Sequence, residues 1–348
     1  MSKVCIPISF CNAGDVLAEE ISNKNGVTLV AKSTVINEYI KNKLIEMDVP
    51  NVWIYHPAEL LGQEEKIVVK NQVTKTYKNT VMTIKQFLYE LSLGCPIDYH
   101  VIKELSGTIF KEIDQSSNII QCLNEIKSAD EYTYTHCVNV AFYSMLTAKW
   151  MKLPDQAIEE IVQAGLLHDI GKTKIPIEIL NKNGKLTTKE FEIMKEHPRF
   201  GYEMLKDIDG ISDEILEAVL QHHERIDGSG YPYQLRSEEL NMYTKIIAVA
   251  DVYDAMTQNR VYKKKVSPFE SFQMFLTTGI SSYDTAVLSA FLKHLAVYYV
   301  GTKVLLSNGE IGEIVYVPPQ DITCPVINIG ATYLDLSKER EVKVVAVV

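Results

Sequence analysis

Apolar residues recur every three or four positions along the middle of the chain, from about residue 80 to residue 298. Such spacing places them on one face of a helix, so each stretch that shows it predicts a helix. The clearest stretches are TIKQFLYEL, SSNIIQCLNEI, THCVNVAFYSMLTAKWM, DQAIEEIVQAGLL, TKEFEIMKEH, SDEILEAVLQHH, TKIIAVADVYDAM and YDTAVLSAFLKHLAVYYV. The pattern therefore predicts an all-helical region over residues 80–298.

The two ends of the chain show shorter apolar segments that are separated by turn residues. Within residues 1–75, Asn25-Gly26 stands between two apolar segments, which is a typical hairpin signal. A helical pattern (NEYIKNKLIEMDV) and a strand-like segment (NVWIYH) follow it. Residues 301–348 contain a second such pair, Asn308-Gly309, and three strand-like segments, CPVINI, TYLDL and VKVVAVV. We therefore predict a mainly α fold with a small mixed α/β module at one end and a small β module at the other.

Composition and charge narrow the classes of partner. The net charge of -10 argues against binding to a long nucleic acid, which requires a broad basic surface. No apolar run approaches the ~18 residues that a membrane span requires, and the first residues make a poor signal peptide. The six cysteines include no C-x-x-C pair, which is typical of free thiols in a reducing compartment. We expect a cytoplasmic protein without a membrane span.

Five of the eight histidines are distributed between positions 136 and 223, within the predicted helical region: His136, His168, His197, His222 and His223. Each has an ordinary explanation when taken alone, as a core histidine with one hydrogen bond or as a residue at a helix end. Asp251 is harder to explain, because it follows the apolar string IIAVA, where an unpaired carboxylate would be costly to bury. Asp169, beside His168 at the end of an apolar helix, raises the same question.

Taken together, five histidines and two aspartates from five segments of one helical core favour a site for two metal ions. Imidazole and carboxylate groups suit Fe, Mn, Zn, Ni and Co. Asp169 has two carboxylate oxygens and can bridge two ions. The adjacent His222 and His223 fit such a site if their helix ends there, and the glycine-rich turn after them supplies that end. Glu224 and Asp227 are then expected to orient the rings and the loop.

The order of these motifs resembles the HD-GYP family, a branch of the HD phosphohydrolases. The family pattern runs H…HD-x-G-K…H-P-x-x-G…HHE-x-x-D-G-x-G-Y-P…D-x-x-D-A-M-T-x-x-R-x-Y. This chain carries its pieces at His136, at 168–172, at 197–201, at 222–232 and at 251–262. The resemblance covers residues 120–275 approximately, and the flanking segments match nothing as specific.

The resemblance implies a phosphodiesterase that hydrolyses cyclic di-GMP to pGpG or GMP with a metal-activated water. It implies that one ion is held by His136, His168, Asp169 and Asp251, and the other by His197, His222 and His223, with Asp169 as the bridge. Asp169 and Lys172 would be catalytic. The substrate-binding residues would be Lys172, Arg260, Lys263, Tyr231 and Gly230.

Two departures from the family pattern refine this picture. Some members have a Glu four residues before the first histidine and bind a third ion, but Tyr132 stands there in this chain. We therefore expect two divalent ions, with Fe or Mn favoured and Zn, Ni or Co as alternatives. The family often has Arg-Pro-Tyr-Arg where this chain has Arg260-Val261-Tyr262-Lys263. Lys263 still offers a positive charge to a phosphate, although it lacks the planar fork of arginine.

Two other functions remain open from the sequence. The chain could be an HD-type phosphohydrolase for another cyclic dinucleotide or for a nucleotide. It could also be a cyclic-dinucleotide sensor or a protein-interaction module with little activity. The partner expectations are a cyclic dinucleotide, a homodimer, and signalling proteins that contact the GYP loop.

Overall fold

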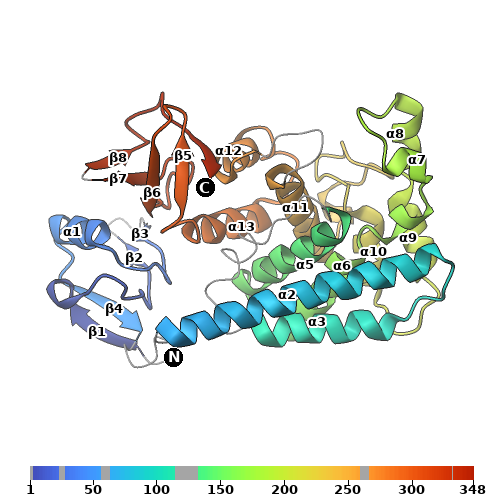
Figure 1. The fold of residues 1–348 in the computed structure, drawn as a ribbon, viewed down its shortest axis with the longest axis horizontal. Coiled ribbons are helices and arrows are strands. Elements are labelled where there is room, and N and C mark those ends of the chain that lie inside the picture. The colour runs from blue at the N-terminus through green and yellow to red at the C-terminus, as the bar shows by residue number, and fades with distance from the viewer. Residues whose placement is uncertain (1–2, 23–27, 56–62, 114–131, 259–265, 331) are drawn as a thin grey trace. The chain divides into compact units, whose positions relative to one another are not determined.

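The computed structural model describes residues 3–22, 28–55, 63–113, 132–258, 266–330 and 332–348. The chain divides into two compact units. One comprises Met1–Val68, Val266–Gln273 and Leu292–Val348, and the other comprises Val69–Lys265 and Met274–Phe291. The second unit is helical and contains the histidine motifs. The first unit contains both ends of the chain, which the sequence predicts as two modules (Figure 1).

The helical unit follows the predicted pattern closely, although the predicted helix in SSNIIQCLNEI lies outside the described residues. Among the described residues, no helix is both long enough and apolar enough to cross a membrane. The helices are α2 (Gln63–Ser92), α3 (Tyr99–Ile113), α5 (Tyr132–Trp150), α6 (Asp155–Leu167), α7 (Ile177–Leu180), α8 (Thr188–Met194), α9 (His197–Leu205), α10 (Asp213–Gln221) and α11 (Met242–Thr257), with short 3-10 helices η4 (Ile170–Lys174) and η5 (Ser237–Glu239). Helices α12 (Pro268–Thr277) and α13 (Thr285–Val297), like α2, contribute residues to both units.

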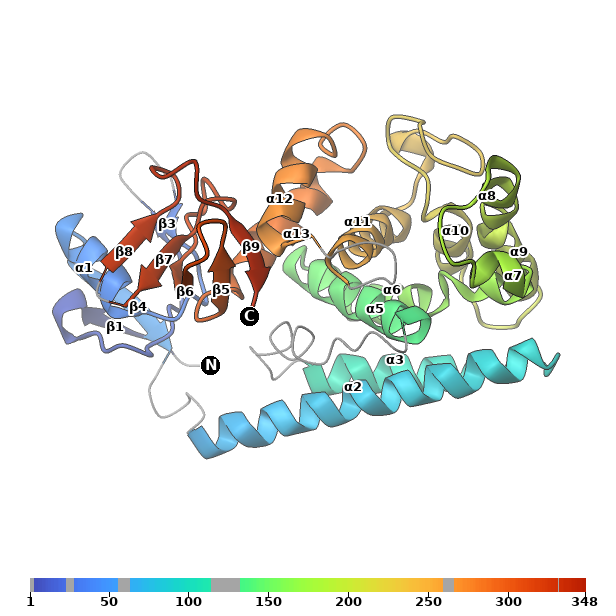
Figure 2. The ribbon, with the colours of Figure 1, turned by 45° about the horizontal axis from the view of Figure 1, so that its top comes forward.

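Helix α5 is the centre of this unit. Every residue from Thr135 to Ala148 is buried, the polar ones included, so the helix is enclosed on all sides. Helices α6 and α11 pack against it, and α7 to α10 lie together beyond them (Figure 2). Gly165 permits the close approach of α6 to α5, because a Cβ atom there would lie 2.7 Å from the Cα of Ala141. This contact brings the end of α6 to His136 of α5.

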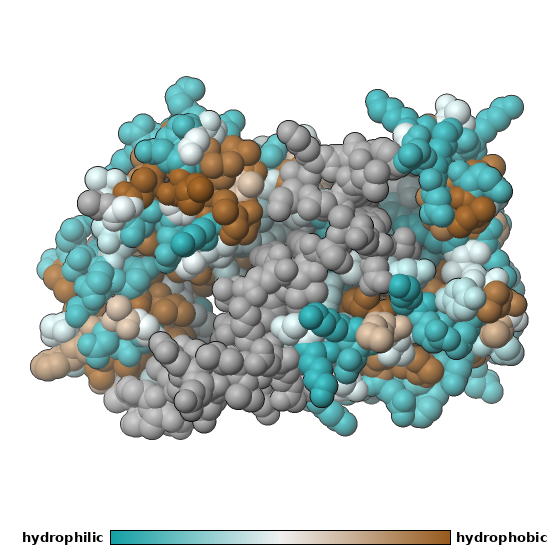
Figure 3. All heavy atoms as spheres, viewed as in Figure 1, coloured by the Kyte–Doolittle hydropathy of each residue, from teal (hydrophilic) through white to brown (hydrophobic). Residues whose placement is uncertain are grey.

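On the face that Figure 3 shows, hydrophobic residues gather over α7 and α8 of the helical unit. Ile177, Phe191 and Ile193 are exposed there. Helix α8 begins with a capping box, in which the Thr187 hydroxyl accepts a hydrogen bond from the Glu190 amide and the Glu190 carboxylate accepts one from the Thr187 amide. This cap ends the preceding loop at a fixed point and so fixes the start of α8.

The N-terminal part of the other unit is a small α/β structure. Strand β1 (Lys3–Pro7) pairs antiparallel with β4 (Asn51–Tyr55), and β2 (Ile21–Ser22) pairs antiparallel with β3 (Thr28–Val30). A short 3-10 helix, η1 (Ile8–Phe10), and helix α1 (Glu38–Glu46) complete it. The pairing of β2 with β3 agrees with the predicted hairpin, although its Asn25-Gly26 turn lies outside the described residues. Its core consists of Ile8, Cys11, Leu17, Val30, Ile36, Ile40, Leu44, Val52 and Ile54.

The C-terminal part is a five-stranded antiparallel sheet with the order β8-β7-β6-β5-β9. Its strands are β5 (Lys303–Leu306), β6 (Ile311–Tyr316), β7 (Val326–Ile329), β8 (Thr332–Asp335) and β9 (Val344–Val347). The turn between β5 and β6 contains Gly309 with φ +87°, which agrees with the predicted Asn-Gly turn. The predicted fold class, mainly helical with small β-rich parts at both ends, is therefore confirmed.

Hydrogen bonds join the two parts of this unit. The side chain of Asn37, which caps α1, donates to the carbonyl of Val315 in β6 at 2.5 Å. The Tyr316 hydroxyl donates to the carbonyl of Leu29. The ring of Tyr39 lies against that of Tyr316. The two ends of the chain therefore build one folded unit.

Candidate metal centre

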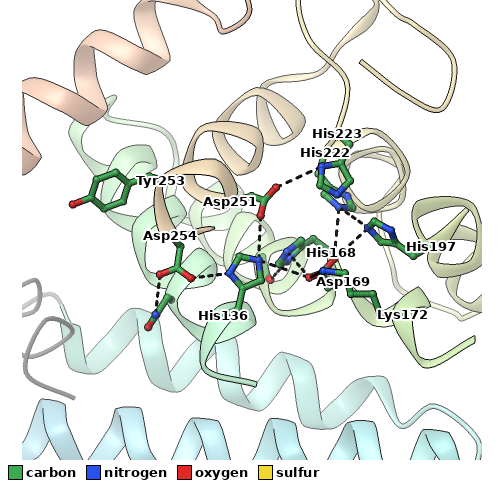
Figure 4. A network of polar contacts seen from close by, with 12 residues as sticks. His136, His168, Asp169, Lys172, His197, His222, His223, Asp251, Tyr253 and Asp254 are labelled. Carbon is green, nitrogen blue, oxygen red and sulfur yellow. Dashed lines mark hydrogen bonds and ion pairs between the residues drawn. The ribbon is translucent and has the colours of Figure 1, made fainter. Parts of the chain in front are cut away.

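The predicted ligands converge at the helix ends of the second unit (Figure 4). His136 lies in α5 and Asp251 in α11, while the other five residues stand directly at a helix terminus. Their side-chain donor atoms form two groups, each with all atoms within 4.8 Å of one another: Asp169, His197, His222 and His223 in one, and His136, His168 and Asp251 in the other. This division is the one that the resemblance implies. The role of each residue as a ligand stays a prediction.

Asp169 lies between the two groups. Its Oδ1 atom is 3.2 Å from His197 Nε2 and 3.8 Å from His222 Nε2. Its Oδ2 atom is 3.4 Å from His168 Nε2 and 3.7 Å from His136 Nε2. Since each oxygen faces a different group, the carboxylate has the placement of a bridge.

Asp251 is the second carboxylate of the centre. Its Oδ1 atom is 3.1 Å from His136 Nε2, and its Oδ2 atom is 3.6 Å from His223 Nδ1. Only 5% of Asp251 is exposed, so its position in an apolar helix is explained by these polar partners. The sequence-based expectation that this buried carboxylate has a partner is confirmed.

Three of the histidines are oriented in the same way. The Nδ1 atoms of His168, His197 and His222 bond to the carbonyl oxygens of Gly165, Met194 and Val219, at 2.7, 2.7 and 2.8 Å. Each acceptor lies three residues earlier, where the end of a helix leaves its carbonyl groups without an intrahelical partner. A donated Nδ1 proton leaves the lone pair on Nε2, which points into the centre.

This arrangement also accounts for the two adjacent histidines. Helix α10 ends at Gln221, and His222 and His223 follow it, as the sequence analysis expects. The rings of His222 and His223 are tilted by 45° with centroids 4.1 Å apart. They face the same group because regular helical geometry no longer separates them.

His136 uses a carboxylate where the other histidines use carbonyl groups. Its Nδ1 atom bonds to Asp254 Oδ2 at 2.7 Å, and Asn139 Nδ2 donates to the other Asp254 oxygen at 2.9 Å. No role for Asp254 is predicted from the sequence. The signal was present, because Asp254 follows Asp251 by three residues and thus lies on the same face of α11.

The protonation states of His222, His223 and Asp169 suit metal binding. Burial and the neighbouring imidazoles lower the pKa of His222 well below the usual value for histidine, and burial does the same for His223. Both rings are therefore neutral at pH 7 and keep a lone pair. Burial would raise the pKa of Asp169, but the positive charge of Lys172 and contacts with His168 outweigh it and hold that pKa well below its usual range.

Two buried atoms of the centre have no hydrogen-bond partner among the described residues: His168 Nε2 and Asp169 Oδ1. Leaving such atoms unpaired in the interior is costly, and native structures rarely do so without a water, an ion or a functional reason. Both atoms point toward the other predicted ligands. The donor set and these unpaired atoms together fit a divalent metal ion.

A close approach of two backbones holds His197 in the centre. Gly171 packs against the start of α9, where a Cβ atom would lie 2.0 Å from the His197 carbonyl oxygen. A Cβ atom at Gly201, on the same helix, would lie 2.8 Å from Val219 of α10. The two motif glycines therefore bring η4, α9 and α10 together, and the histidines with them.

Only some of the residues predicted to bind substrate belong to the part of the chain that the structure describes. Lys172 Nζ donates to Asp169 Oδ2 at 2.5 Å, and its side chain is 24% exposed at the edge of the centre. The ring of Tyr231 stacks on that of His223, with centroids 4.7 Å apart and planes 30° apart. Arg260 and Lys263 lie outside the described residues, as does the side chain of Tyr132.

The packing of the loop by itself requires a glycine at position 230. A Cβ atom there would lie 2.4 Å from the Cα of Glu224 and 2.5 Å from the amide nitrogen of Arg225. The glycine thus allows the loop to pack on its own backbone. Contact between Gly230 and substrate stays a prediction.

The loop after the histidine pair is held by its acidic residues. Buried Glu224 accepts hydrogen bonds from the amides of Tyr233 and Leu235, at 2.6 and 3.1 Å. Asp227 accepts from the Ser229 amide at 2.9 Å and from the Ser282 hydroxyl at 3.0 Å. These bonds agree with the expected role in the loop, whereas the ring nitrogens are held by backbone carbonyls and by Asp254.

Comparison with known proteins gives the same family. Residues 121–287 match the family model of the HD domain. A cyclic di-GMP phosphodiesterase of Pseudomonas aeruginosa is 37% identical over 237 residues, which are 68% of this chain and 57% of that protein. A 3'3'-cGAMP-specific phosphodiesterase of Vibrio cholerae is 29% identical over 232 residues, 64% of this chain and 54% of that protein.

A solved structure extends the likeness to the fold. An HDG"Y"P protein from Bdellovibrio bacteriovorus matches 83% of this chain and 98% of its own chain, with a TM-score of 0.55 and 12% identity. The chain spans more than half, but less than two thirds, of the length of the two relatives. The family model and the motifs around the two histidine groups agree: residues 121–287 form an HD domain, with the motifs of its HD-GYP branch.

Proposed function

We propose that this protein is a metal-dependent phosphodiesterase that hydrolyses cyclic di-GMP to pGpG, GMP or both. The observation that carries the proposal is the position of Asp169, whose two oxygens face two separate groups of buried histidines. Two unpaired buried atoms in those groups add support. A relative that is named for this substrate is 37% identical to this chain over 237 residues.

In this proposal each residue group has a defined task. His136, His168 and Asp251 hold one divalent ion, His197, His222 and His223 hold the other, and Asp169 binds both. Two such ions, when bound, lower the pKa of a water molecule and neutralise phosphate oxygens. Fe or Mn is favoured, with Zn, Ni and Co as alternatives, because imidazole and carboxylate donors suit all of these metals.

The remaining residues act on the substrate. Lys172 keeps its proton, because the charge of Asp169 outweighs the effect of burial and raises the lysine pKa. Its ammonium group is therefore placed to donate to a phosphate oxygen or to the leaving oxygen beside the centre. Tyr231, held flat against His223, forms part of the rim. Arg260, Lys263 and Gly230 complete the proposed substrate contacts.

A second candidate substrate is another cyclic dinucleotide, 3'3'-cGAMP. The relative from Vibrio cholerae that is specific for it supports this alternative. The two substrates share the phosphodiester that the metal centre would cleave and differ in one base. The distinction must therefore come from residues outside the metal centre.

The test is a comparison of Asp169→Asn with wild type and with His100→Ala. Asn keeps the shape of Asp but lacks its charge, so it is a poor bridge between two ions. His100 forms an exposed pair with Glu104 at 3.3 Å and is a matched control for the loss of a histidine–carboxylate contact. We expect Asp169→Asn to lose bound metal and turnover of cyclic di-GMP, and His100→Ala to keep both. Full metal content and full turnover in Asp169→Asn would refute the proposal, and faster turnover of 3'3'-cGAMP by wild type would favour the alternative.

A further inference from the structure

Behind the metal centre lies a chain of buried hydrogen bonds that ends outside the matched HD domain. The Tyr77 hydroxyl of α2 donates to Asn139 Oδ1 at 2.8 Å. Asn139 Nδ2 donates to Asp254 Oδ1 at 2.9 Å, and His136 Nδ1 bonds to Asp254 Oδ2 at 2.7 Å (Figure 4). This series of hydrogen bonds therefore connects Tyr77 to His136, a predicted metal ligand. Tyr77 lies outside the HD match, which begins at residue 121.

All of these groups are removed from solvent. The exposed fraction is 1% for Tyr77, 0% for Asn139, 0% for Asp254 and 2% for His136. In such an environment each hydrogen bond is strong, and the loss of one leaves a polar atom without compensation from water. The ring of Tyr77 is also fixed, because it packs edge-to-face on Phe142 of α5 with centroids 5.7 Å apart. The hydroxyl is therefore held in one place.

The direction of the bonds is set by chemistry. The Asp254 carboxylate accepts hydrogen bonds, so it requires the NH₂ end of the Asn139 side chain. The carbonyl end must then face Tyr77, and only a donor can satisfy it there. Burial, with a contribution from the charge of Asp254, raises the pKa of Tyr77, so its hydroxyl remains a donor at every physiological pH.

We infer that Tyr77 is a positioning residue for the metal centre, acting through Asn139 and Asp254 on the ring of His136. A carboxylate behind a metal-bound histidine fixes its ring and makes it a better ligand, and loss of such a group typically weakens metal binding by about 10- to 100-fold. Tyr77 acts indirectly, because it holds the side-chain amide of Asn139, which in turn holds the Asp254 carboxylate. The inference rests on the metal centre proposed above.

The consequence is that the HD motifs alone do not complete the site. Helix α2 supplies the Tyr77 hydroxyl, which holds Asn139 in place. Without it, the hydrogen bond from Asn139 would no longer fix the orientation of the Asp254 carboxylate. The ion held by the His136 group should depend on Tyr77 more than the ion held by the His197 group, because the relay ends at His136.

The experiment is a Co²⁺ titration of the full-length, metal-free protein, followed by visible absorption, with Tyr77→Phe, Asp254→Asn and the double variant. We expect Asp254→Asn to weaken Co²⁺ binding at the site of the His136 group by about 10- to 100-fold. Tyr77→Phe should weaken binding at the same site by about 10-fold, and the Co²⁺ spectrum should be altered in both variants. In the Asp254→Asn background, Tyr77→Phe should add little, because the relay is already broken.

Tyr99→Phe is the matched control. The Tyr99 hydroxyl also donates to a buried amide carbonyl, that of Gln163, and both side chains are buried. Among the described residues, however, Gln163 makes no hydrogen bond to the two histidine groups. We expect the Co²⁺ affinity and spectrum of Tyr99→Phe to match wild type.

The outcomes separate this inference from the proposed function. If wild type binds Co²⁺ at two sites and Tyr77→Phe binds it as wild type does, the inference is wrong and the metal centre stands. An additive double variant would also overturn it, since additivity would mean that Tyr77 and Asp254 act independently. If wild type binds no Co²⁺, the metal centre is wrong, and the inference fails with it.

Discussion

Addition of Mn²⁺ to metal-free protein should raise the melting temperature of the helical unit strongly. In the absence of metal, the centre contains two unpaired buried atoms and several imidazoles at close distances, such as His197 Nε2 and His222 Nε2 at 3.2 Å. Metal ions would bind these groups only in the folded state, because the unfolded chain has no assembled site. Binding therefore stabilises the fold by mass action.

The magnitude depends on the number of sites. One site at a free metal concentration 100 times its Kd contributes about 2.7 kcal/mol to the free energy of unfolding. For a unit of this size, each kcal/mol raises Tm by about 2–4 °C, so one site predicts roughly 5–11 °C and two sites roughly twice that shift. The two groups of donor atoms around Asp169 predict the larger value.

Differential scanning calorimetry with Mn²⁺ and with a chelator measures the shift. Asp169→Asn should reduce it below the value for one site, because both groups share that carboxylate. His100→Ala, which removes an exposed histidine on α3, should leave it unchanged. A shift below the range for one site in wild type, with Mn²⁺ well above millimolar concentration, would refute the reasoning.

Two further predictions concern the elements around the centre. Gly171→Ala should lower the free energy of unfolding by about 1–3 kcal/mol or more in a urea titration, because its Cβ would lie 2.0 Å from the His197 carbonyl oxygen. Gly107→Ala in α3, where a Cβ meets nothing within 4 Å, should raise it by roughly 0.5–1 kcal/mol, and equal effects of the two substitutions would contradict the structure. Glu190 should titrate by NMR with a pKa of about 2, because hydrogen bonds from Lys182 and from the start of α8 stabilise its carboxylate. Its folded pKa is below its ordinary 4.5, so its contribution to stability is present above pH 4.5 and is lost as the pH falls toward 2. Lys182→Met should return the pKa of Glu190 toward 4.5. A wild-type Glu190 pKa near 4.5 would contradict the hydrogen bonds that Lys182 and the start of α8 make to this carboxylate.

The candidate ligands can be recognised in the sequence because their local signals are strong. His168 and His222 stand where apolar helical patterns end, and Asp251 interrupts an apolar helix without a local reason. Such anomalies can be recognised from neighbouring residues alone. Their convergence was inferred from the joint pattern and the family resemblance, and the structure brings them within reach of one another.

The groups behind the ligands could not be predicted in the same way. Asp254 meets His136 across 118 positions of sequence, and Tyr77 meets Asn139 across 62. Tyr77 and Asn139 do not depart from the local pattern, and the position of Asp254 on the same helix face as Asp251 does not identify His136 and Asn139 as its partners. Their roles follow from helix packing, which a periodicity of apolar residues does not specify.

The ends of the chain and the glycine-rich loop show the same limit. The contact between Asn37 and Val315 spans 278 positions, so the two predicted modules gave no sign that they form one unit. Gly230 was expected to allow a ligand to approach, but the backbone that approaches it most closely is that of Glu224. A glycine in a sequence indicates a close contact without naming the partner.

The most direct test of the proposed function is a single measurement on anaerobically purified wild-type protein. Bound metal per chain and turnover of cyclic di-GMP are determined on the same sample, before and after treatment with a chelator. We expect two divalent ions per chain, hydrolysis to pGpG or GMP, and loss of both ions and turnover with the chelator. Hydrolysis that persists after the metal is gone, or two bound ions without hydrolysis of any cyclic dinucleotide, would contradict it.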